Sequence, residues 1–264
     1  MRVRIYAIGD LHLPGGDKKP MDIFGKHWEH HFERICENWR SRVGEEDIVL
    51  IPGDISWAMQ LSRAAEDLRR IAQLPGRTLI LRGNHDYWWS SLTQLRDLLP
   101  ANMHAVQNDA FDGGEFVLCG TRGWVIPPSV TAQGQTDASL EDASAQDAQA
   151  RADALPVQDA ASAQDEKLYR REAIRLEMSL DAAKKIACGR PIVAMMHYPP
   201  VTPDTLRSGT EFTRLLSRYG VSRCVYGHLH GRSIRRAFVG EYGGVRYDLV
   251  SCDALEFRLL DVTP

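Results

Sequence analysis

The sequence predicts an α/β protein, and two observations lead to this prediction. Short runs rich in β-branched and apolar residues alternate with amphipathic helical patterns, as they do where helices flank a sheet. The runs are also continuously apolar, which is typical of strands that are buried on both faces. The predicted strands cover residues 3–10, 47–54, 77–84, 116–123, 191–198 and 222–230.

Two helices and a hairpin are predicted between and after these strands. Residues 58–72 carry apolar side chains at helical spacing and are followed by Pro75-Gly76. Residues 166–188 show the same periodicity and end before Gly189. The stretch around Gly243-Gly244 predicts a hairpin turn, so part of the sheet system is expected to be antiparallel.

One segment, residues 132–166, differs from the rest of the chain in composition. It consists almost entirely of Ala, Gln, Asp and Ser and offers little apolar surface to bury. We interpret it as a mobile insertion, in part helical and without chemistry. It interrupts a single domain that is expected to span residues 1–264.

The overall charge is nearly balanced. The chain of 264 residues has 32 basic and 35 acidic side chains and a net charge of −3. This argues against binding long nucleic acid through overall charge, so an anionic ligand would need a local site.

The sequence also predicts the compartment. Five scattered cysteines without a CxxC spacing predict reduced thiols. The first apolar run is too short for a signal peptide, and no stretch reaches the length of a membrane span. We therefore expect a cytoplasmic protein without a membrane partner, of open oligomeric state.

Polar side chains collect where the predicted strands end, which is where open α/β sheets bind their ligands. They are Asp10 and His12 in GDLH, Asp54 in PGD, Asn84, His85 and Asp86 in RGNHD, His197 in MMHYPP, and His228 and His230 in GHLH. Residues two apart in an extended segment point to the same side, so Asp10 should share a pocket with His12, and His228 with His230. Adjacent residues point apart, which predicts different roles for Asn84 and His85.

The donor types at these strand ends predict a metal site. Carboxylates, imidazoles and an amide, with no thiolate, suit Mn²⁺, Fe or Zn²⁺. Two ions bridged by one carboxylate would need about this many ligands. A single histidine at a strand end is more often a hydrogen-bonded structural residue, but that interpretation does not account for five histidines with carboxylate partners.

The order D-x-H, GD, GNHD, H and GHxH resembles the calcineurin-like metallophosphoesterase family, and the match runs nearly from end to end. Within the family the chain resembles a group of bacterial phosphohydrolases whose name carries no substrate. The resemblance implies two mixed β-sheets packed as a sandwich and flanked by helices, a four-layer α-β-β-α arrangement. It also implies a centre of two divalent ions at one edge, with Mn²⁺ expected before Fe or Zn²⁺.

The resemblance also implies a ligand set. Seven residues would be metal ligands: Asp10, His12 and His230 for the first ion, Asp54 between both ions, and Asn84, His197 and His228 for the second. The implied reaction is in-line attack of a metal-bridging hydroxide on phosphorus, with the ions roughly 3.5–4 Å apart. His85 would donate a proton to the leaving group, and Asp86 would orient or charge His85.

Other residues near the motifs have two readings. Arg82 and Arg122 would bind phosphate or pair with carboxylates, and Tyr198, held by the two prolines after it, would lie near the substrate. Three tryptophans after motif residues would either wall the pocket or, as we prefer, pack in the core: Trp57, Trp88 and Trp89. Residues 14–31 are either a lid hinged at Gly15-Gly16 or, by preference, a solvated loop leading into a helix.

We therefore expect a phosphoesterase for a small phosphomonoester or phosphodiester. A nuclease or cyclic-nucleotide phosphodiesterase with the same centre is the alternative, and a steep salt dependence would distinguish binding to many phosphates. A non-catalytic metal-binding scaffold is a remote alternative, because all the ligands are present. Protein phosphatase activity ranks below activity on small molecules, because no peptide-docking feature is visible.

Overall fold

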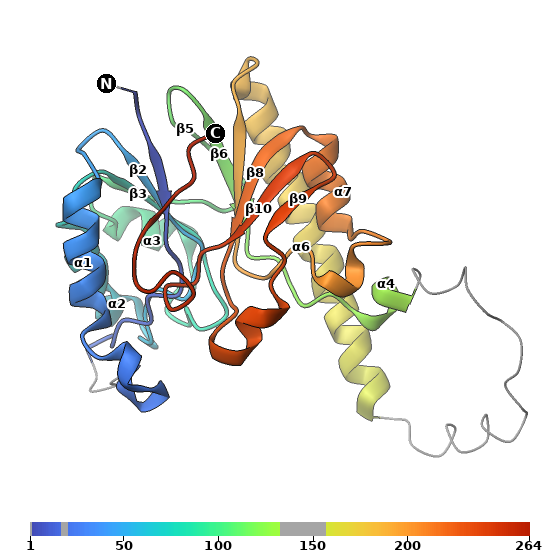
Figure 1. The fold of residues 1–264 in the computed structure, drawn as a ribbon, viewed down its shortest axis with the longest axis horizontal. Helices are drawn as coiled ribbons and strands as arrows, with labels where there is room; N and C mark the ends of the chain where they lie inside the picture. The colour runs from blue at the N-terminus through green and yellow to red at the C-terminus, as the bar shows by residue number, and fades with distance from the viewer. Residues whose placement is uncertain (1, 17–20, 133–156) are drawn as a thin grey trace, which may run out of the picture.

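Two mixed β-sheets face each other in the computed structural model, which describes residues 2–16, 21–132 and 157–264 (Figure 1). The first sheet has the order β11-β1-β2-β3-β4 and the second the order β5-β6-β7-β8-β10-β9. The strands of the first sheet are β1 (Ile5–Ala7), β2 (Ile48–Ile51), β3 (Arg77–Ile80), β4 (Met103–Ala105) and β11 (Leu260–Asp261). Those of the second are β5 (Ala110–Asp112), β6 (Val117–Thr121), β7 (Ile192–Met196), β8 (Val221–Tyr226), β9 (Gly240–Tyr242) and β10 (Val245–Leu249).

Helices cover the outer face of each sheet, so the fold has four layers. In Figure 1, α1 and α2 lie outside the first sheet, and α6 and α7 lie outside the second. The α-helices are α1 (His31–Arg42), α2 (Leu61–Ala72), α3 (Leu92–Leu98), α4 (Pro128–Ala132), α6 (Val157–Ala187) and α7 (Glu211–Arg218). Short 3-10 helices are η1 (Met21–Phe24), η2 (Lys26–Trp28), η3 (Pro203–Thr205) and η4 (Gly231–Arg236).

Alternation along the strands explains why these runs are apolar throughout. In β1, Ile5 and Ala7 lie in the cluster between the two sheets, whereas Tyr6 belongs to the cluster under α1 and α2. In β7, Val193 likewise faces the other sheet and Ala194 faces α6. Successive side chains of a strand point to opposite faces, so a strand between two apolar layers needs apolar residues at every position.

The predicted sandwich with flanking helices is confirmed, including its antiparallel part. Strands β9 and β10 pair antiparallel on either side of Gly243-Gly244, with Val245 opposite Tyr242. The predicted helix at 166–188 begins earlier, at Val157, because Ala, Gln and Glu favour helix even where they have little to bury. The rest of the predicted insertion, residues 133–156, lies outside the described residues.

None of the helices in the described part of the chain combines the length and apolar content that crossing a membrane would require.

The carboxyl ends of the central strands of both sheets meet at one edge of the sandwich. Strands β1 to β4 run parallel in the first sheet, and β6, β7, β8 and β10 run parallel in the second. A backbone hydrogen bond of 2.6 Å from Gly9 to Val250 joins the end of β1 to the end of β10. The loops that leave these strands therefore converge from two sheets onto one place.

Candidate metal centre

The strand-end motifs leave the strands in left-handed backbone conformations. Asp10, His12, Asp54 and His228 have φ angles of 58°, 47°, 52° and 73°. The prediction that Asp10 and His12 share a pocket is confirmed, but the predicted reason is wrong, because neither residue is extended. A non-glycine residue with positive φ is uncommon and strained, and such residues gather at functional sites.

Glycines before the polar residues allow the loops to pass one another. A Cβ atom on Gly83 would lie 2.1 Å from Oδ1 of Asp54, and one on Gly227 would lie 2.4 Å from Oδ2 of Asp10. Both distances are well inside van der Waals contact. The glycines of the GNHD and GHLH motifs are thus required because a carboxylate packs directly against the backbone there.

Asp10, His12 and His230 form the first cluster of possible ligands. Their ligand atoms lie within 4.8 Å of one another, and the Nε2 atoms of His12 and His230 are 3.3 Å apart. Nδ1 of His230 donates a hydrogen bond of 2.8 Å to Asp253, which turns Nε2 toward Asp10. A carboxylate behind a histidine is the usual support of a metal-binding imidazole.

The second cluster contains His197, Asn84 and His228. Oδ1 of Asn84 lies 2.6 Å from Nε2 of His197 and 2.9 Å from Nδ1 of His228. The fully buried His197 donates from Nδ1 to the carbonyl of Pro52 at 3.0 Å, so its Nε2 faces the cluster. His228 and His230, expected to share a pocket, are directed to different clusters.

Asp54 lies between the two clusters. Its Oδ2 atom is 3.9 Å from Nε2 of His12 and 3.6 Å from Nε2 of His197. Asp10, Asp54 and His197 also form a group whose ligand atoms lie within 4.8 Å of one another. One buried carboxylate therefore faces both clusters, as expected for a residue between two ions.

Burial sets the protonation of the centre. Burial, together with the charge of Asp10, raises the pKa of Asp54 to about 8. Burial lowers the pKa of His12 to about 3 and that of His228 to about 4. Burial opposes the charged form of His230 as well, but Asp10 and Asp253 raise its pKa to about 10.

Asp10 is the carboxylate that carries the negative charge of this arrangement. Burial opposes its ionisation, but the contact with His230 and the neighbouring imidazoles lower its pKa below the ordinary range. A dense set of buried titratable groups with strongly displaced pKa values is typical of a functional site.

His85 and Asp86 do not form the predicted pair. Asp86 is fully buried, and burial with the nearby Asp54 charge raises its pKa to about 7. Its oxygens accept hydrogen bonds from the backbone N–H groups of Gly83, Asp54, Ile55 and Ser56 and from the indole of Trp88. The expectation that Asp86 orients His85 is therefore corrected: Asp86 joins the loop after β2 to the loop after β3, because four of these donors are backbone groups that no strand satisfies.

His85 itself lies over the first cluster. Its backbone N–H donates to Oδ1 of Asp54 at 2.8 Å, and its ring lies 5.9 Å from that of His12. Its Nδ1 is buried and has no hydrogen-bond partner within the described ranges. Burial lowers the pKa of this imidazole.

Arg82, Arg122 and Tyr198 lie beside the second cluster. Arg82 and Arg122 line a cavity of about 160 Å³, and the Nε atoms of both are buried without a hydrogen-bond partner among the described residues. The ring of Tyr198 lies 4.2 Å from that of His228, and burial raises its pKa to about 12, so it is a neutral phenol. Arg122 also contacts Glu172 at 3.8 Å, which keeps part of the predicted carboxylate pairing.

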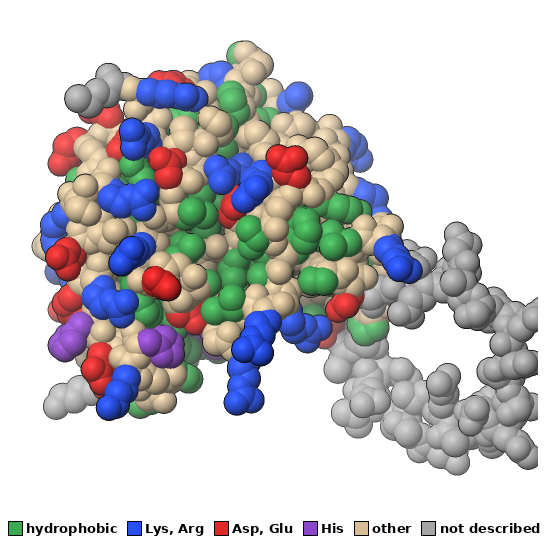
Figure 2. Space-filling view, viewed as in Figure 1, with side chains coloured by type: hydrophobic (Ala, Val, Ile, Leu, Met, Phe, Trp, Pro, Cys, Tyr) green, Lys and Arg blue, Asp and Glu red, His purple; other side chains and the backbone are tan. Residues whose placement is uncertain are grey.

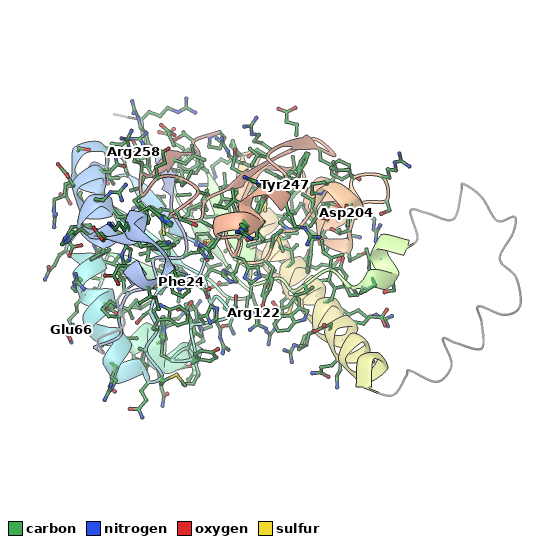
Figure 3. All side chains as sticks on the ribbon, turned by 60° about the horizontal axis from the view of Figure 1, so that its bottom comes forward. Phe24, Glu66, Arg122, Asp204, Tyr247 and Arg258 are labelled. Carbon is green, nitrogen blue, oxygen red and sulfur yellow. The ribbon has the colours of Figure 1, made fainter. Side chains whose placement is uncertain are left out.

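Apolar residues wall the other side of the centre. Trp57 stacks on His12 with ring centroids 4.8 Å apart, so it is a pocket wall, contrary to the preference for core packing. Trp88 and Trp89 are buried in the core, as preferred. Met21, Phe24 and Trp28, in the segment expected to be a solvated loop, line the same cavity. Figure 3 shows Phe24 beside the first sheet and Arg122 beside the second.

Sequence reasoning missed Asp253, the partner of His230. It follows β10, so a carboxylate just after an apolar run was the available signal. It also missed Asp67, which accepts hydrogen bonds from Gly15 at 2.8 Å and from Ser56 at 2.6 Å and so holds the loop after β2. No local pattern distinguishes Asp67 from the other polar residues of α2.

The fold and the site together define a class of protein. The family model of the calcineurin-like phosphoesterases matches residues 3–232, and the chain belongs to this family. The family depends on divalent metal ions, and the described residues contain two groups that could hold them. Membership therefore supports a phosphoesterase.

Comparisons with individual proteins give likeness of fold. Phosphopantetheinyl hydrolase from Mycobacterium tuberculosis is 16% identical, with a TM-score of 0.50 over 99% of this chain and 96% of that chain. The protein of unknown function AQ665 from Aquifex aeolicus is 12% identical, with a TM-score of 0.45 over 98% of this chain and 96% of that one. A purple acid phosphatase from yellow lupin, Lupinus luteus, is 10% identical, with a TM-score of 0.40 over 94% of this chain and 43% of that one. No curated protein sequence matches the chain.

Proposed function

We propose that the protein is a phosphoesterase that uses two divalent metal ions to hydrolyse a small phosphate ester. The position of Asp54 carries the proposal, because its carboxylate lies within 4 Å of an imidazole nitrogen from each cluster. On this proposal Asp10, His12 and His230 hold one ion, and Asn84, His197 and His228 hold the other. Mn²⁺ is proposed first, with Fe and Zn²⁺ as alternatives, because the donors are imidazole, carboxylate and amide.

The supporting contacts around the clusters fit such ions. His197 and His230 each use Nδ1 as a donor to the protein, to Pro52 and Asp253, which leaves Nε2 directed inward. When bound there, two ions would lower the pKa of a water molecule and neutralise phosphate oxygens. The remaining work falls to side chains of the chain itself.

His85 is the proposed proton donor to the leaving group. Its ring stands beside the first cluster, close to Trp57 at 4.6 Å between centroids, and its Nδ1 has no partner in the described part of the protein. Asp86 acts on catalysis only through position, because it holds the backbone on which Asp54 and Asn84 stand.

Arg82, Arg122 and Tyr198 are the proposed phosphate-binding residues. Arginine offers paired N–H donors to phosphate, and a neutral phenol offers an O–H donor. Arg82 is two residues from Asn84, and the carbonyl of Arg122 accepts the backbone hydrogen bond of His197 at 3.1 Å. Both arginines are thereby tied to residues of the second cluster.

A small ester is proposed in preference to long nucleic acid. The net charge is −3, and on the face shown in Figure 2 Lys and Arg side chains alternate with Asp and Glu. Binding many phosphates needs a basic stripe. We also propose that residues 1–264 form one domain and that the protein works in the cytoplasm, in line with its scattered cysteines.

The experiment compares hydrolysis of 4-nitrophenyl phosphate with that of bis(4-nitrophenyl) phosphate. Metal-stripped protein is assayed before and after addition of Mn²⁺, and bound metal is counted per chain. We expect turnover that depends on metal and disappears in Asp54→Ala. The control is Asp204→Ala, which removes an exposed carboxylate away from the clusters.

Two results would contradict the proposal. A protein that binds no metal would remove the centre. A protein that binds two ions per chain but hydrolyses neither ester would favour the scaffold alternative. The preferred ester separates monoesterase from diesterase activity.

A further inference from the structure

A cavity of about 340 Å³ opens beside the first cluster. Its outer wall is apolar and consists of Met21, Phe24, Trp28 and Trp57, and its inner wall includes His12 and His85. Pockets of this size hold small organic groups and are mostly apolar. The cavity and the candidate centre therefore share two histidines.

The wall is held firmly on its inner side and is open at Phe24. Trp28 is buried, and the indole N–H of Trp57 donates to the sulfur of Met21 at 3.3 Å. Phe24 is 59% exposed, so its ring stands at the mouth. The two tryptophans present fixed aromatic surfaces, which favour a flat apolar ligand.

Charge narrows the ligand further. Among the described residues that line the cavity, none is Lys or Arg, and Asp253 is the one carboxylate. An anionic group would have no cationic partner here and would lie near Asp253. The cavity thus favours an uncharged group, whereas the arginines lie in a different cavity beside the second cluster.

We propose that this cavity binds the alcohol part of the phosphate ester and that this part carries an uncharged aromatic group. The inference rests on the proposed function. Hydrolysis breaks the bond from phosphorus to the alcohol oxygen, forms a new bond from phosphorus to a water oxygen, and sends the alcohol away with a proton. His85, the proposed donor of that proton, lines the cavity, so the leaving alcohol lies on this side of the centre.

The test compares two esters whose alcohols leave about equally well. They are 2-naphthylmethyl phosphate and ethyl phosphate, or their methyl diesters if the centre prefers diesters. We expect kcat/KM to favour the naphthylmethyl ester at least about tenfold, because filling an apolar pocket discriminates by roughly this factor or more. A ratio near one would overturn the inference.

Two adjacent residues of η1 give matched variants. Phe24→Ala removes a wall of the cavity, and Ile23→Ala removes a neighbouring side chain that is 74% exposed and lies outside the lining. We expect Phe24→Ala to reduce the ratio about fivefold to tenfold and Ile23→Ala to leave both rates unchanged. Equal losses on both esters in Phe24→Ala, or equal effects of the two variants, would overturn the inference.

A binding measurement separates this inference from the proposed function. If no ester is hydrolysed, the proposed function fails, and calorimetry with 2-naphthylmethanol then decides the preference of the cavity. Binding that Phe24→Ala weakens and Ile23→Ala preserves supports an aromatic-binding cavity. Lack of binding to the wild-type protein, with ethyl and naphthylmethyl esters treated alike, overturns it.

Discussion

The Nε2 atoms of His12 and His230 lie 3.3 Å apart, although 218 positions separate the two residues in the chain. The backbone bridge between Gly9 and Ser251 brings the two loops together. The first cluster thus exists only while the loops after β1, β8 and β10 are in place. Metal binding should therefore be linked to folding of both sheets.

Metal ions should stabilise the protein against unfolding. A ligand that binds only the folded state at 100 times its Kd adds about 2.7 kcal/mol to the free energy of unfolding. We expect a rise of this order when Mn²⁺ is added to metal-stripped protein, measured by urea unfolding. Asp54→Ala should show a much smaller rise, and an equal rise in both proteins would place the bound metal elsewhere.

Replacement of His85 should affect esters according to their leaving groups. A proton donor matters most when the alcohol leaves poorly, so His85→Asn should lower kcat by about a hundredfold or more for an alkyl phosphate. The loss for 4-nitrophenyl phosphate should be small, because nitrophenolate leaves without a proton. Rates for a series of esters measure this, and equal losses throughout would remove His85 from the role.

Replacement of Asp86 should act on stability. Asp86→Asn puts an N–H donor where backbone N–H groups now point at a carboxylate, and we expect a loss of about 2–4 kcal/mol in the free energy of unfolding. The dependence of rate on leaving group should stay that of the wild type in the folded variant. Asp97→Asn, on an exposed position of α3, is the control and should change stability little.

A steeper leaving-group dependence in Asp86→Asn would contradict this assignment. That result would mean that Asp86 acts on proton transfer by His85 after all.

Acid should remove a contribution of Asp109 to stability. Burial opposes its ionisation, but His104, the Gln107 N–H and Arg96 lower its pKa below the ordinary 3.8. A carboxyl whose pKa is lower in the folded state stabilises above its unfolded pKa and loses that contribution as the pH falls through the folded value. The difference in unfolding free energy between wild type and Asp109→Asn should therefore be largest near neutrality and shrink below about pH 4.

Urea unfolding of both proteins at several pH values measures this difference. A difference that does not change with pH would show that the ionised carboxylate of Asp109 contributes nothing.

Local sequence patterns were sufficient for the sandwich strands and for the residues that collect at their ends. The runs around β2, β3 and β7 are apolar at every position because each strand lies between two apolar layers. Helix α6 shows the limit of this reasoning, since it begins at Val157, where the sequence has few apolar residues. Helix-favouring residues extend a helix beyond the part that packs.

The site was predicted in composition but not in geometry. Extended backbone was assumed for Asp10 and His12, whereas both residues are left-handed. The pairing of Asp86 with His85 was inferred from adjacency, but the backbone of a neighbouring loop supplies the hydrogen-bond donors. Asp253 was missed because its role depends on His230, from which it is separated by two strands.

The sequence by itself determined the α/β class, the polar residues at the strand ends and, through their order, the resemblance to the phosphoesterases. Only the tertiary structure decided which of these residues meet, which carboxylate lies between the clusters and which aromatic side chains wall the cavity. The physical reason is range: periodicity and motifs express contacts between near neighbours in the chain. The centre is made of contacts between loops that the pairing of strands brings together from both sheets.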